Sequence, residues 1–355
     1  MKKVFPALPE RILLIRLKGI GDVILSTPLV RALRKKFPQA EIHFLIRAFC
    51  APILIHNPYL NKLLIHPEKS ASLGEKFTFV KSLRDAGYDW VLDLAAEPRS
   101  AWLTLATGAP LRAGYSFRIR KWAFNKRIPK NKIRKYQGEI NLDIIRALGV
   151  SDDGNQTEIY LTPEEMEWGS RAFDQPEFKD LKKKIGLNPT GMWSSKRWPA
   201  DYWRRLASLI YEKWGFKAIL MGGPGDKELL EEIRWGIEGK VLVKPGSNLL
   251  ESAGFISKLD IVIGNDGTPQ HIAQAFGTKS LTLCGPHWGI GWTRPNDIRH
   301  RYLQHFLDCG PCDFNVCPFP RQEGMAAHVH KECLVKIMPQ EVMGVAGQML
   351  QVNPT

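Results

Sequence analysis

Residues 11–22, RILLIRLKGIGD, combine a short apolar run with a glycine-containing turn that ends on a carboxylate. Such a run is typical of a strand that is buried on both faces of a sheet. The apolar positions of residues 23–37 then recur at helical spacing as far as Pro38, and residues 41–46 form the next apolar run. Strand, helix and strand in this order predict a βαβ unit, from which open parallel sheets are built.

The same alternation continues along the chain and restarts after a polar stretch. In the first half we expect a helix at 77–86, a strand at 90–94 and a helix at 100–106. Residues 151–184 are polar and carry one expected helix, which starts near Thr162. Beyond them we expect strands at 184–188, 217–221, 241–243, 260–263 and 280–284, separated by helices at 200–214, 226–237, 249–258 and 269–276.

This pattern predicts an α/β chain of two doubly wound domains. We place the first domain at residues 1–165 and the second at residues 166–355, and the last helix is a candidate to pack back on the first domain. The length of 355 residues fits roughly two domains of about 150 residues each. A hydrophobic content of 44% and a charged content of 24% exclude disordered, collagen-like and coiled-coil chains. Neither a membrane span nor a secretion signal is evident, so we expect a cytoplasmic protein.

Positive charge is concentrated in residues 111–137. The chain carries 50 Lys and Arg against 36 Asp and Glu, a net charge of +14. Residues 111–137 contain no acid and ten cations: Arg112, Arg118, Arg120, Lys121, Lys126, Arg127, Lys130, Lys132, Arg134 and Lys135. A dense basic segment predicts an anionic partner, with a solvated surface as the alternative. A nucleic-acid-binding protein is the alternative from another functional class. We expect no nucleic acid as the partner, because no nucleic-acid-binding motif is evident and the charge lies in one segment.

Ligands of open α/β sheets bind outside the carboxyl ends of the strands, so polar residues after strands are the candidates for a site. In the first domain this residue is Asp22, which is either a helix cap or a base that accepts the proton of a hydroxyl group. The glycine turn before it is no dinucleotide fingerprint, because that pattern requires glycine where Ile24 stands.

In the second domain, Thr190 and Gly191 follow a strand, and Lys196 precedes a helix. The amides of such a turn and a fixed cation suit a diphosphate, although a surface cation is the alternative for Lys196. Residues 261–271, IVIGNDGTPQH, form a buried strand, a polar turn and the start of a helix, where free amides favour an anion. The two loops together predict a site for a nucleotide diphosphate that carries a polyhydroxylated group, with these residues in the second loop: Asp266, Gly267, Thr268 and His271.

Four of the six cysteines have a spacing close to that of structural zinc sites: Cys309, Cys312, Cys317 and Cys333. The spacing leaves two possibilities for these four cysteines, a zinc site or a set of reduced thiols. Cys50 and Cys284 lie in apolar contexts, so we expect buried thiols there.

Three ordered motifs resemble those of glycosyltransferase family 9, whose members include the ADP-heptose lipopolysaccharide heptosyltransferases. They are RILLIR with Gly21 and Asp22, KRWP at residues 196–199, and DGTPQHIAQAFG at residues 266–277. The resemblance runs from about residue 11 to about residue 335. It implies a GT-B fold, in which two Rossmann-like domains face each other across a cleft, the first binding the acceptor and the second the nucleotide sugar.

The resemblance also implies a reaction, the inverting transfer of heptose from ADP-heptose to a lipopolysaccharide inner-core acceptor without an obligatory metal. Asp22 matches the general base, Lys196 the residue near the donor phosphates, and residues 266–271 the loop that holds sugar and diphosphate. The DGTPQ form differs from the commoner Asp-Ser-Gly or Asp-Thr-Gly forms, so another nucleotide sugar is the alternative donor. An anionic acceptor implies peripheral association with the inner face of the inner membrane and binding by part of the basic segment: Arg112, Arg118, Arg120 and Lys121.

Overall fold

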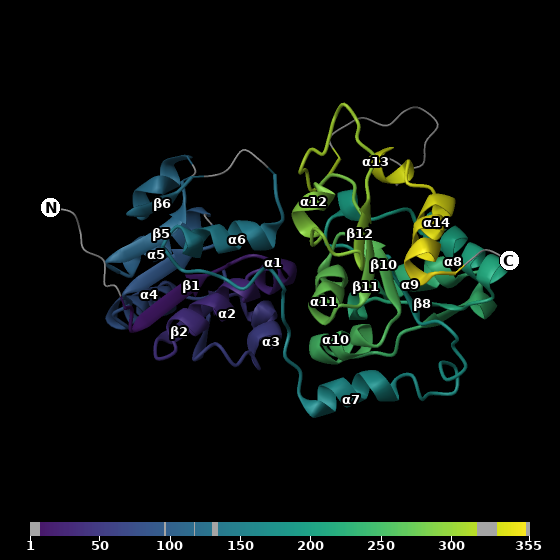
Figure 1. Ribbon diagram of the computed structural model, residues 1–355, viewed down its shortest axis with the longest axis horizontal. Helices are drawn as coiled ribbons and strands as arrows, with labels where there is room; N and C mark the ends of the chain where they lie inside the picture. The colour runs from purple at the N-terminus through teal and green to yellow at the C-terminus, as the bar shows by residue number, and fades with distance from the viewer. Residues whose placement is uncertain (1–7, 96, 117, 130–133, 318–331, 353–355) are drawn as a thin grey trace. The chain divides into compact units, whose positions relative to one another are not determined.

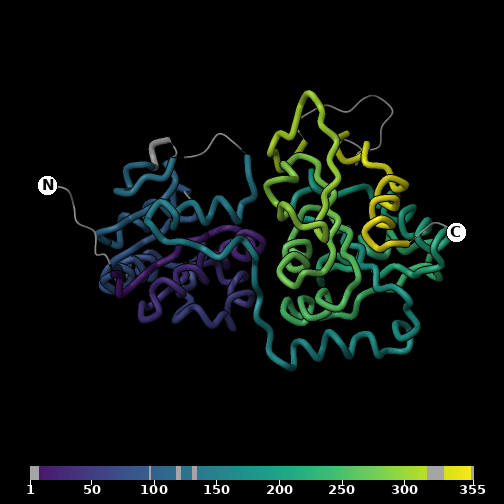
Figure 2. Tube along the Cα trace, viewed as in Figure 1, coloured from purple at the N-terminus to yellow at the C-terminus, as the bar shows by residue number. Residues whose placement is uncertain are grey.

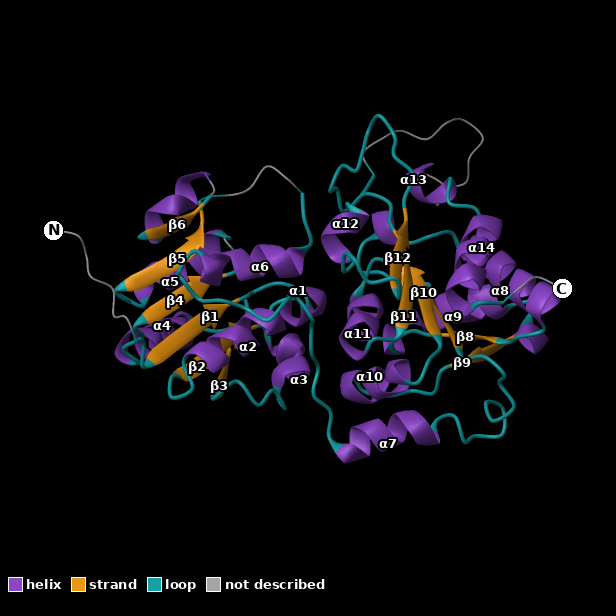
Figure 3. Ribbon diagram, viewed as in Figure 1, coloured by secondary structure: helices purple, strands orange, loops and turns teal. Residues whose placement is uncertain are grey.

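The computed structural model describes residues 8–95, 97–116, 118–129, 134–317 and 332–352 (Figure 1), without the side chains of residues 118–120. It divides into two compact units, Met1–Tyr160 and Leu161–Thr355. Each unit contains a six-stranded sheet in which all neighbouring strands are parallel (Figure 3). Among the described residues, no helix is long and apolar enough to cross a membrane.

The first unit has the strand order β3-β2-β1-β4-β5-β6. Its strands are β1 Arg11–Ile15, β2 Glu41–Ile46, β3 Lys62–Ile65, β4 Trp90–Asp93, β5 Leu111–Tyr115 and β6 Lys126–Ile128. Its helices are α1 Ile20–Ile24, α2 Thr27–Lys36, η1 Ala48–Cys50, α3 Ala51–Leu54, α4 Leu73–Asp85, α5 Pro98–Ala106, η2 Arg118–Ala123 and α6 Gln137–Arg146. The apolar run of β1 is buried on both faces, as predicted: Ile12, Leu13, Leu14 and Ile15 are 0% exposed.

The order of these strands fixes where a ligand site lies. Strands β2 and β3 are added to the sheet on one side of β1, and β4 to β6 are added on its other side. The order in which strands are added therefore reverses between β1 and β4, although all strands stay parallel. Right-handed crossovers therefore place helices on both faces. Helix α2 contacts α6, and α4 contacts α5, which in turn contacts η2. The reversal between β1 and β4 is the topological switch point of the first sheet.

The second unit has the order β12-β11-β10-β7-β8-β9, with its switch point between β10 and β7. Its strands are β7 Ile185–Asn188, β8 Ala218–Leu220, β9 Val241–Val243, β10 Ile261–Asn265, β11 Lys279–Leu283 and β12 His300–Leu303. Its helices are α7 Pro163–Arg171, η3 Ser194–Lys196, α8 Ala200–Trp214, η4 Pro224–Asp226, α9 Lys227–Arg234, η5 Glu238–Lys240, α10 Leu249–Ser257, α11 Thr268–Phe276, α12 Gly289–Trp292, α13 Glu332–Val335 and α14 Pro339–Leu350.

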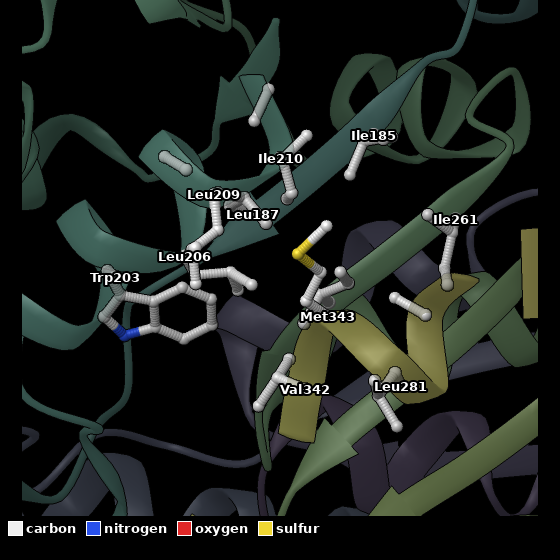
Figure 4. Packing of buried hydrophobic residues seen from close by; sticks show 14 of the residues in the cluster. Ile185, Leu187, Trp203, Leu206, Leu209, Ile210, Ile261, Leu281, Val342 and Met343 are labelled. Atoms are coloured by element: carbon white, nitrogen blue, oxygen red, sulfur yellow. The ribbon is translucent and has the colours of Figure 1, made fainter. Parts of the chain in front are cut away.

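The core of the second unit joins the sheet to its first and last long helices. Leu187 of β7 and Leu206 of α8 lie in one buried cluster with Val342 of α14 (Figure 4). Helix α14 contacts α8 and β10, so the last helix packs within the second unit. Figure 2 shows this helix in yellow beside the teal trace of α8.

The single helix expected over residues 23–37 is wrong in one respect. The structure has two helices there, α1 and α2, which are separated at Leu25 and Ser26. Pro28 is the second residue of α2, where its missing N–H costs nothing, whereas in a continuous helix it would lose a hydrogen bond and clash with the preceding turn.

Helices α7 and α10 pack closely against each other at a point where a glycine of one helix faces a glycine of the other. A Cβ atom built on Gly169 would lie 2.3 Å from the carbonyl carbon of Gly254, and one built on Gly254 would lie 2.4 Å from the carbonyl oxygen of Glu165. Only glycine at both positions lets these backbones approach so closely. The crossing anchors α7, the first helix of the second unit, which Thr162 caps as predicted.

We expect Gly169→Ala to lower the free energy of unfolding by about 3 kcal/mol, because its methyl group would meet backbone that must move. Gly344→Ala is the matched control, since Gly344 also lies inside a helix but a Cβ there meets nothing within 4 Å. That control should gain about 0.5–1 kcal/mol. Denaturant unfolding of the three proteins measures both effects, and equal stability of the two variants would contradict the close crossing.

Candidate functional site

In the first unit, Asp22 is held by a buried arginine at the end of β1. The Nη2 atom of Arg16 lies 2.5 Å from Oδ1 of Asp22, and the Arg16 side chain is only 3% exposed. The Nη1 atom of Arg16 donates to the carbonyl oxygen of Leu94, which follows β4. Arg16 therefore bridges β1 and β4 at the switch point and presents Asp22 there.

The second oxygen of Asp22 accepts a longer hydrogen bond, 3.3 Å, from the backbone N–H of Gly19 at the start of α1. Asp22 can therefore cap α1 and act as a base from the same side-chain position. The Asp22 side chain is 17% exposed, so solvent or a substrate hydroxyl group reaches it.

In the second unit, the structure brings Lys196 and Asp266 together. Nζ of Lys196 lies 2.5 Å from Oδ2 of Asp266, although the two residues are 70 positions apart. Lys196 ends η3 in the connection after β7, and Asp266 follows β10, so the pair spans the second switch point. Burial would raise the pKa of Asp266, but Lys196, with His271 and His287, holds that pKa below its ordinary value.

Asn265 fixes the loop that carries Lys196. Its side-chain oxygen accepts from the backbone N–H of Trp198 at 3.0 Å, and its amide nitrogen donates to the carbonyl oxygen of Pro189 at 2.7 Å. The Asn265 side chain is fully buried. It therefore joins both ends of the loop after β7 to the end of β10, which limits how far Lys196 can move.

Two histidines and two tryptophans surround this ion pair. His271, in α11, and His287 both act on the charge of Asp266, and Nδ1 of His287 lies 3.9 Å from Oδ2 of that residue. Nζ of Lys196 lies 4.8 Å from the ring centre of Trp193 and 6.0 Å from that of Trp292. Burial, together with Lys196, lowers the pKa of His287, so its ring is neutral near pH 7. Among the described residues its Nε2 atom is buried and has no hydrogen-bond partner.

The remaining donor-site candidates lie on the same two loops. Thr190 donates to the side-chain oxygen of Asn188 at 3.0 Å, and Gly191 accepts from Arg197 through its carbonyl oxygen. Gly267 and Thr268 begin α11, where the first backbone N–H groups lack partners within the helix. The loops after β7 and β10 thus offer a lysine, hydroxyl groups and free amides, which together suit a diphosphate.

The basic segment is β5, η2, β6 and their connections. Arg112 donates to the backbone carbonyl oxygens of Ala109 and Ala123, and burial lowers its pKa. It therefore braces the chain around η2. Lys121 is exposed, whereas the side chains of Arg118 and Arg120 lie outside the described part of the structure.

The structure does not support the zinc site considered for the four cysteines. All four are described, and in the described part of the chain no group of three or more His, Cys, Asp or Glu side chains is arranged to hold a metal ion. Burial, and the nearby Cys317, Cys309 and Cys312, raise the pKa of Cys333 to about 11, so Cys333 is a neutral thiol near pH 7. Cys50 and Cys284 are free and buried, as predicted.

Sequence reasoning missed three residues that shape these sites: Arg16, Asn265 and His287. A signal exists for the first two, because each is a polar residue at the end of an apolar strand, where only a paired side chain is tolerated. His287 lies four residues after β11, and its nearness to Asp266 depends on the pairing of β11 with β10.

Comparison with known proteins identifies the family of this chain. The family model described as glycosyltransferase family 9 (heptosyltransferase) matches residues 76–321. Lipopolysaccharide heptosyltransferase 3 of Escherichia coli is 26% identical over 283 residues, which cover 77% of this chain and 82% of that protein.

Two solved structures show the same fold. The crystal structure of a glycosyltransferase family 9 protein from Veillonella parvula matches with a TM-score of 0.79 and 22% identity, and the match covers 99% of both chains. The E. coli heptosyltransferase WaaC, solved with ADP-2-deoxy-2-fluoro heptose, matches with a TM-score of 0.69 and 17% identity over 95% of this chain and 99% of that one. The predicted GT-B fold with two Rossmann-like domains is confirmed. The chain belongs to glycosyltransferase family 9, the heptosyltransferase family, and is a glycosyltransferase.

Proposed function

We propose that this enzyme transfers heptose from ADP-heptose to an inner-core lipopolysaccharide acceptor, with inversion at the anomeric carbon. The observation that carries this proposal is the Lys196–Asp266 pair at the switch point of the second sheet, beside the amides of α11. The relative solved with an ADP-heptose analogue has the same fold, which supports ADP-heptose as the donor. A transferase of this fold that uses another nucleotide sugar is the second candidate, because residues 266–270 read DGTPQ.

In this proposal the second unit binds the donor. Lys196 and the first amides of α11 neutralise the diphosphate, and Asp266 keeps Lys196 oriented toward it. Thr190, Gly191 and Gly267 allow the backbone to approach the phosphates, while Thr268 and His271 lie beside the sugar. Because Lys196 is already charged and held before the donor arrives, stabilising the leaving group requires little reorganisation.

The first unit supplies the base. Asp22 accepts the proton of the acceptor hydroxyl group as its oxygen attacks the anomeric carbon. The bond between that carbon and the diphosphate oxygen breaks, and ADP leaves with the electron pair while Lys196 stabilises its charge. One displacement from the opposite face inverts the anomeric centre. No step uses a metal ion or a cofactor.

Arg16 positions Asp22 in this mechanism. Its two hydrogen bonds, to Asp22 and to the carbonyl oxygen of Leu94, fix the carboxylate against β4. The guanidinium orients Asp22, and orientation supplies much of the rate enhancement when the anomeric carbon already carries positive charge.

In this proposal the first unit binds the acceptor. We propose that Arg112, Arg118, Arg120 and Lys121 lie along the path of the anionic acceptor and that the enzyme works at the inner face of the inner membrane. The ten cations without an acid in residues 111–137 support an anionic acceptor. We propose no nucleic-acid partner, because ten of the 14 net positive charges lie in this one segment and no nucleic-acid-binding motif is evident.

A product assay over a panel of nucleotide sugars tests the proposal. With a heptose-deficient core acceptor, we expect ADP-heptose to give product with the inverted anomeric configuration, seen by NMR, at a rate at least about 100-fold above that with UDP- or GDP-sugars. Lys196→Met should weaken donor binding, whereas Lys179→Met, which alters an exposed lysine of the same unit, should not. Preference for another nucleotide sugar would replace the proposed donor by the second candidate.

We expect Asp22→Asn to lower kcat by about 100-fold or more, because the amide cannot accept the proton of the acceptor hydroxyl group. The dissociation constant for the donor, measured by calorimetry, should change little, since Asp22 lies in the other unit. Asp174→Asn, which alters an exposed carboxylate, is the matched control. Near-normal turnover of Asp22→Asn would refute the assignment of the base.

We expect Arg16→Met to lower kcat about tenfold while the dissociation constant for the donor changes little, because Asp22 loses the guanidinium that orients it. Arg16→Lys keeps the charge and one hydrogen bond, so it should restore part of the rate. Steady-state kinetics and thermal unfolding of both variants measure these effects. A purely structural role would lower the melting temperature of both variants and leave kcat of the folded enzyme unchanged.

A further inference from the structure

One helical layer of the first unit exposes five large apolar side chains. They belong to α4, α5 and η2, and we call their surface the α4–α5 face: Leu73, Phe77, Trp102, Leu105 and Trp122. Leu73 is 85% exposed, Phe77 is 72% exposed, and the two tryptophans are about half exposed, at 50% and 49%. Side chains of this size are usually covered when they cluster, so such a face indicates an interaction surface.

The five side chains lie on one side of the unit. Helix α4 contacts α5, and α5 contacts η2, so the three elements form a continuous layer over the sheet. Leu83 of α4 and Leu103 of α5 point into the core and are 2% exposed. Leu73 and Phe77 are four residues apart, and Trp102 and Leu105 are three apart, which places each pair on the same stripe of its helix, away from the core.

Cations are interspersed among these apolar side chains. Exposed cations on α4, α5, η2 and β6 are Lys81, Arg84, Arg99, Lys121 and Arg127. The same elements expose two acids, Glu75 and Asp85. Glu75 is engaged in the cap of α4, where it accepts from the backbone N–H of Ser72 at 2.7 Å. The α4–α5 face is therefore both apolar and positively charged.

We propose that the α4–α5 face docks on a bilayer surface that contains anionic lipids. Tryptophan side chains insert at the boundary between headgroups and acyl chains, and lysine and arginine side chains reach the phosphate groups beside them. Each cation near such a surface adds to the attraction. A protein partner fits less well, because the centre of a protein interface is depleted of charge, whereas here cations separate the apolar side chains.

This inference rests on the proposed function and deepens it, since it names the surface that meets the membrane holding the acceptor. Helix α5 begins at Pro98, shortly after Leu94, whose carbonyl oxygen accepts from Arg16. Docking through α5 would therefore bring the Asp22 end of the first sheet near the lipid headgroups.

Sedimentation with vesicles tests the proposal on the full chain. With vesicles of phosphatidylcholine and about 30% phosphatidylglycerol, we expect the wild type to bind and phosphatidylcholine alone to retain little of it. Trp102→Ala combined with Trp122→Ala should weaken partition at least about tenfold. Lys81→Gln combined with Arg84→Gln should weaken it about fivefold per charge, and less at high salt. Trp235→Ala, which removes an exposed tryptophan of the second unit, is the matched control.

Transfer to a delipidated, soluble acceptor separates the two proposals. We expect the paired tryptophan variant to keep wild-type turnover on that acceptor, which would also show that it folds. Binding of the variant equal to that of the wild type, or no binding of the wild type, would overturn the docking face and leave the proposed reaction untouched. A concentration-dependent dimer that the tryptophan changes abolish would make the face a self-interface and would also overturn the proposal.

Discussion

An ion pair with one buried member at the carboxyl end of a parallel sheet is the constraint on which both sites depend. Arg16 and Asp22 form this pair in the first unit, and Lys196 and Asp266 form it in the second. A buried charge without a partner is strongly destabilising, so each pair holds its loops in one arrangement. Each pair also lies at the switch point of its sheet, where the flanking loops diverge and leave room for a ligand.

The rest of each unit keeps these pairs in place. The strands that carry them are buried on both faces, and close packing leaves the loops little freedom at their bases. In the second unit, Asn265 adds hydrogen bonds across the loop of Lys196, and the tryptophan rings limit the space around Nζ. The charges are thus arranged before a substrate arrives, as electrostatic stabilisation of a leaving group requires.

Much of this could be predicted from the sequence, because apolar runs and turn residues report local structure. Strand β2 and helix α8 have the predicted bounds, and Lys196 and Asp266 lie in the loops assigned to the donor. The short strands β3, β5, β6 and β12 escaped prediction, since they lie at or next to sheet edges and are less apolar. Contacts such as that of His287 with Asp266 also escaped, because they depend on which strands are neighbours in the sheet, and the cysteine spacing alone could not show how the thiols are arranged.

The two pairs differ in how far apart their members lie in the chain, and this difference has a consequence for function. Arg16 and Asp22 are six residues apart, so the end of β1 and the start of α1 largely define their geometry. Lys196 and Asp266 are 70 residues apart, so their geometry depends on the packing of β7 against β10. Gly264 lies at that packing, where an added Cβ would be 2.9 Å from the Cβ of Asn188. The donor site is therefore sensitive to changes in the core beneath it, whereas the site of the base is sensitive mainly to changes in its own loop.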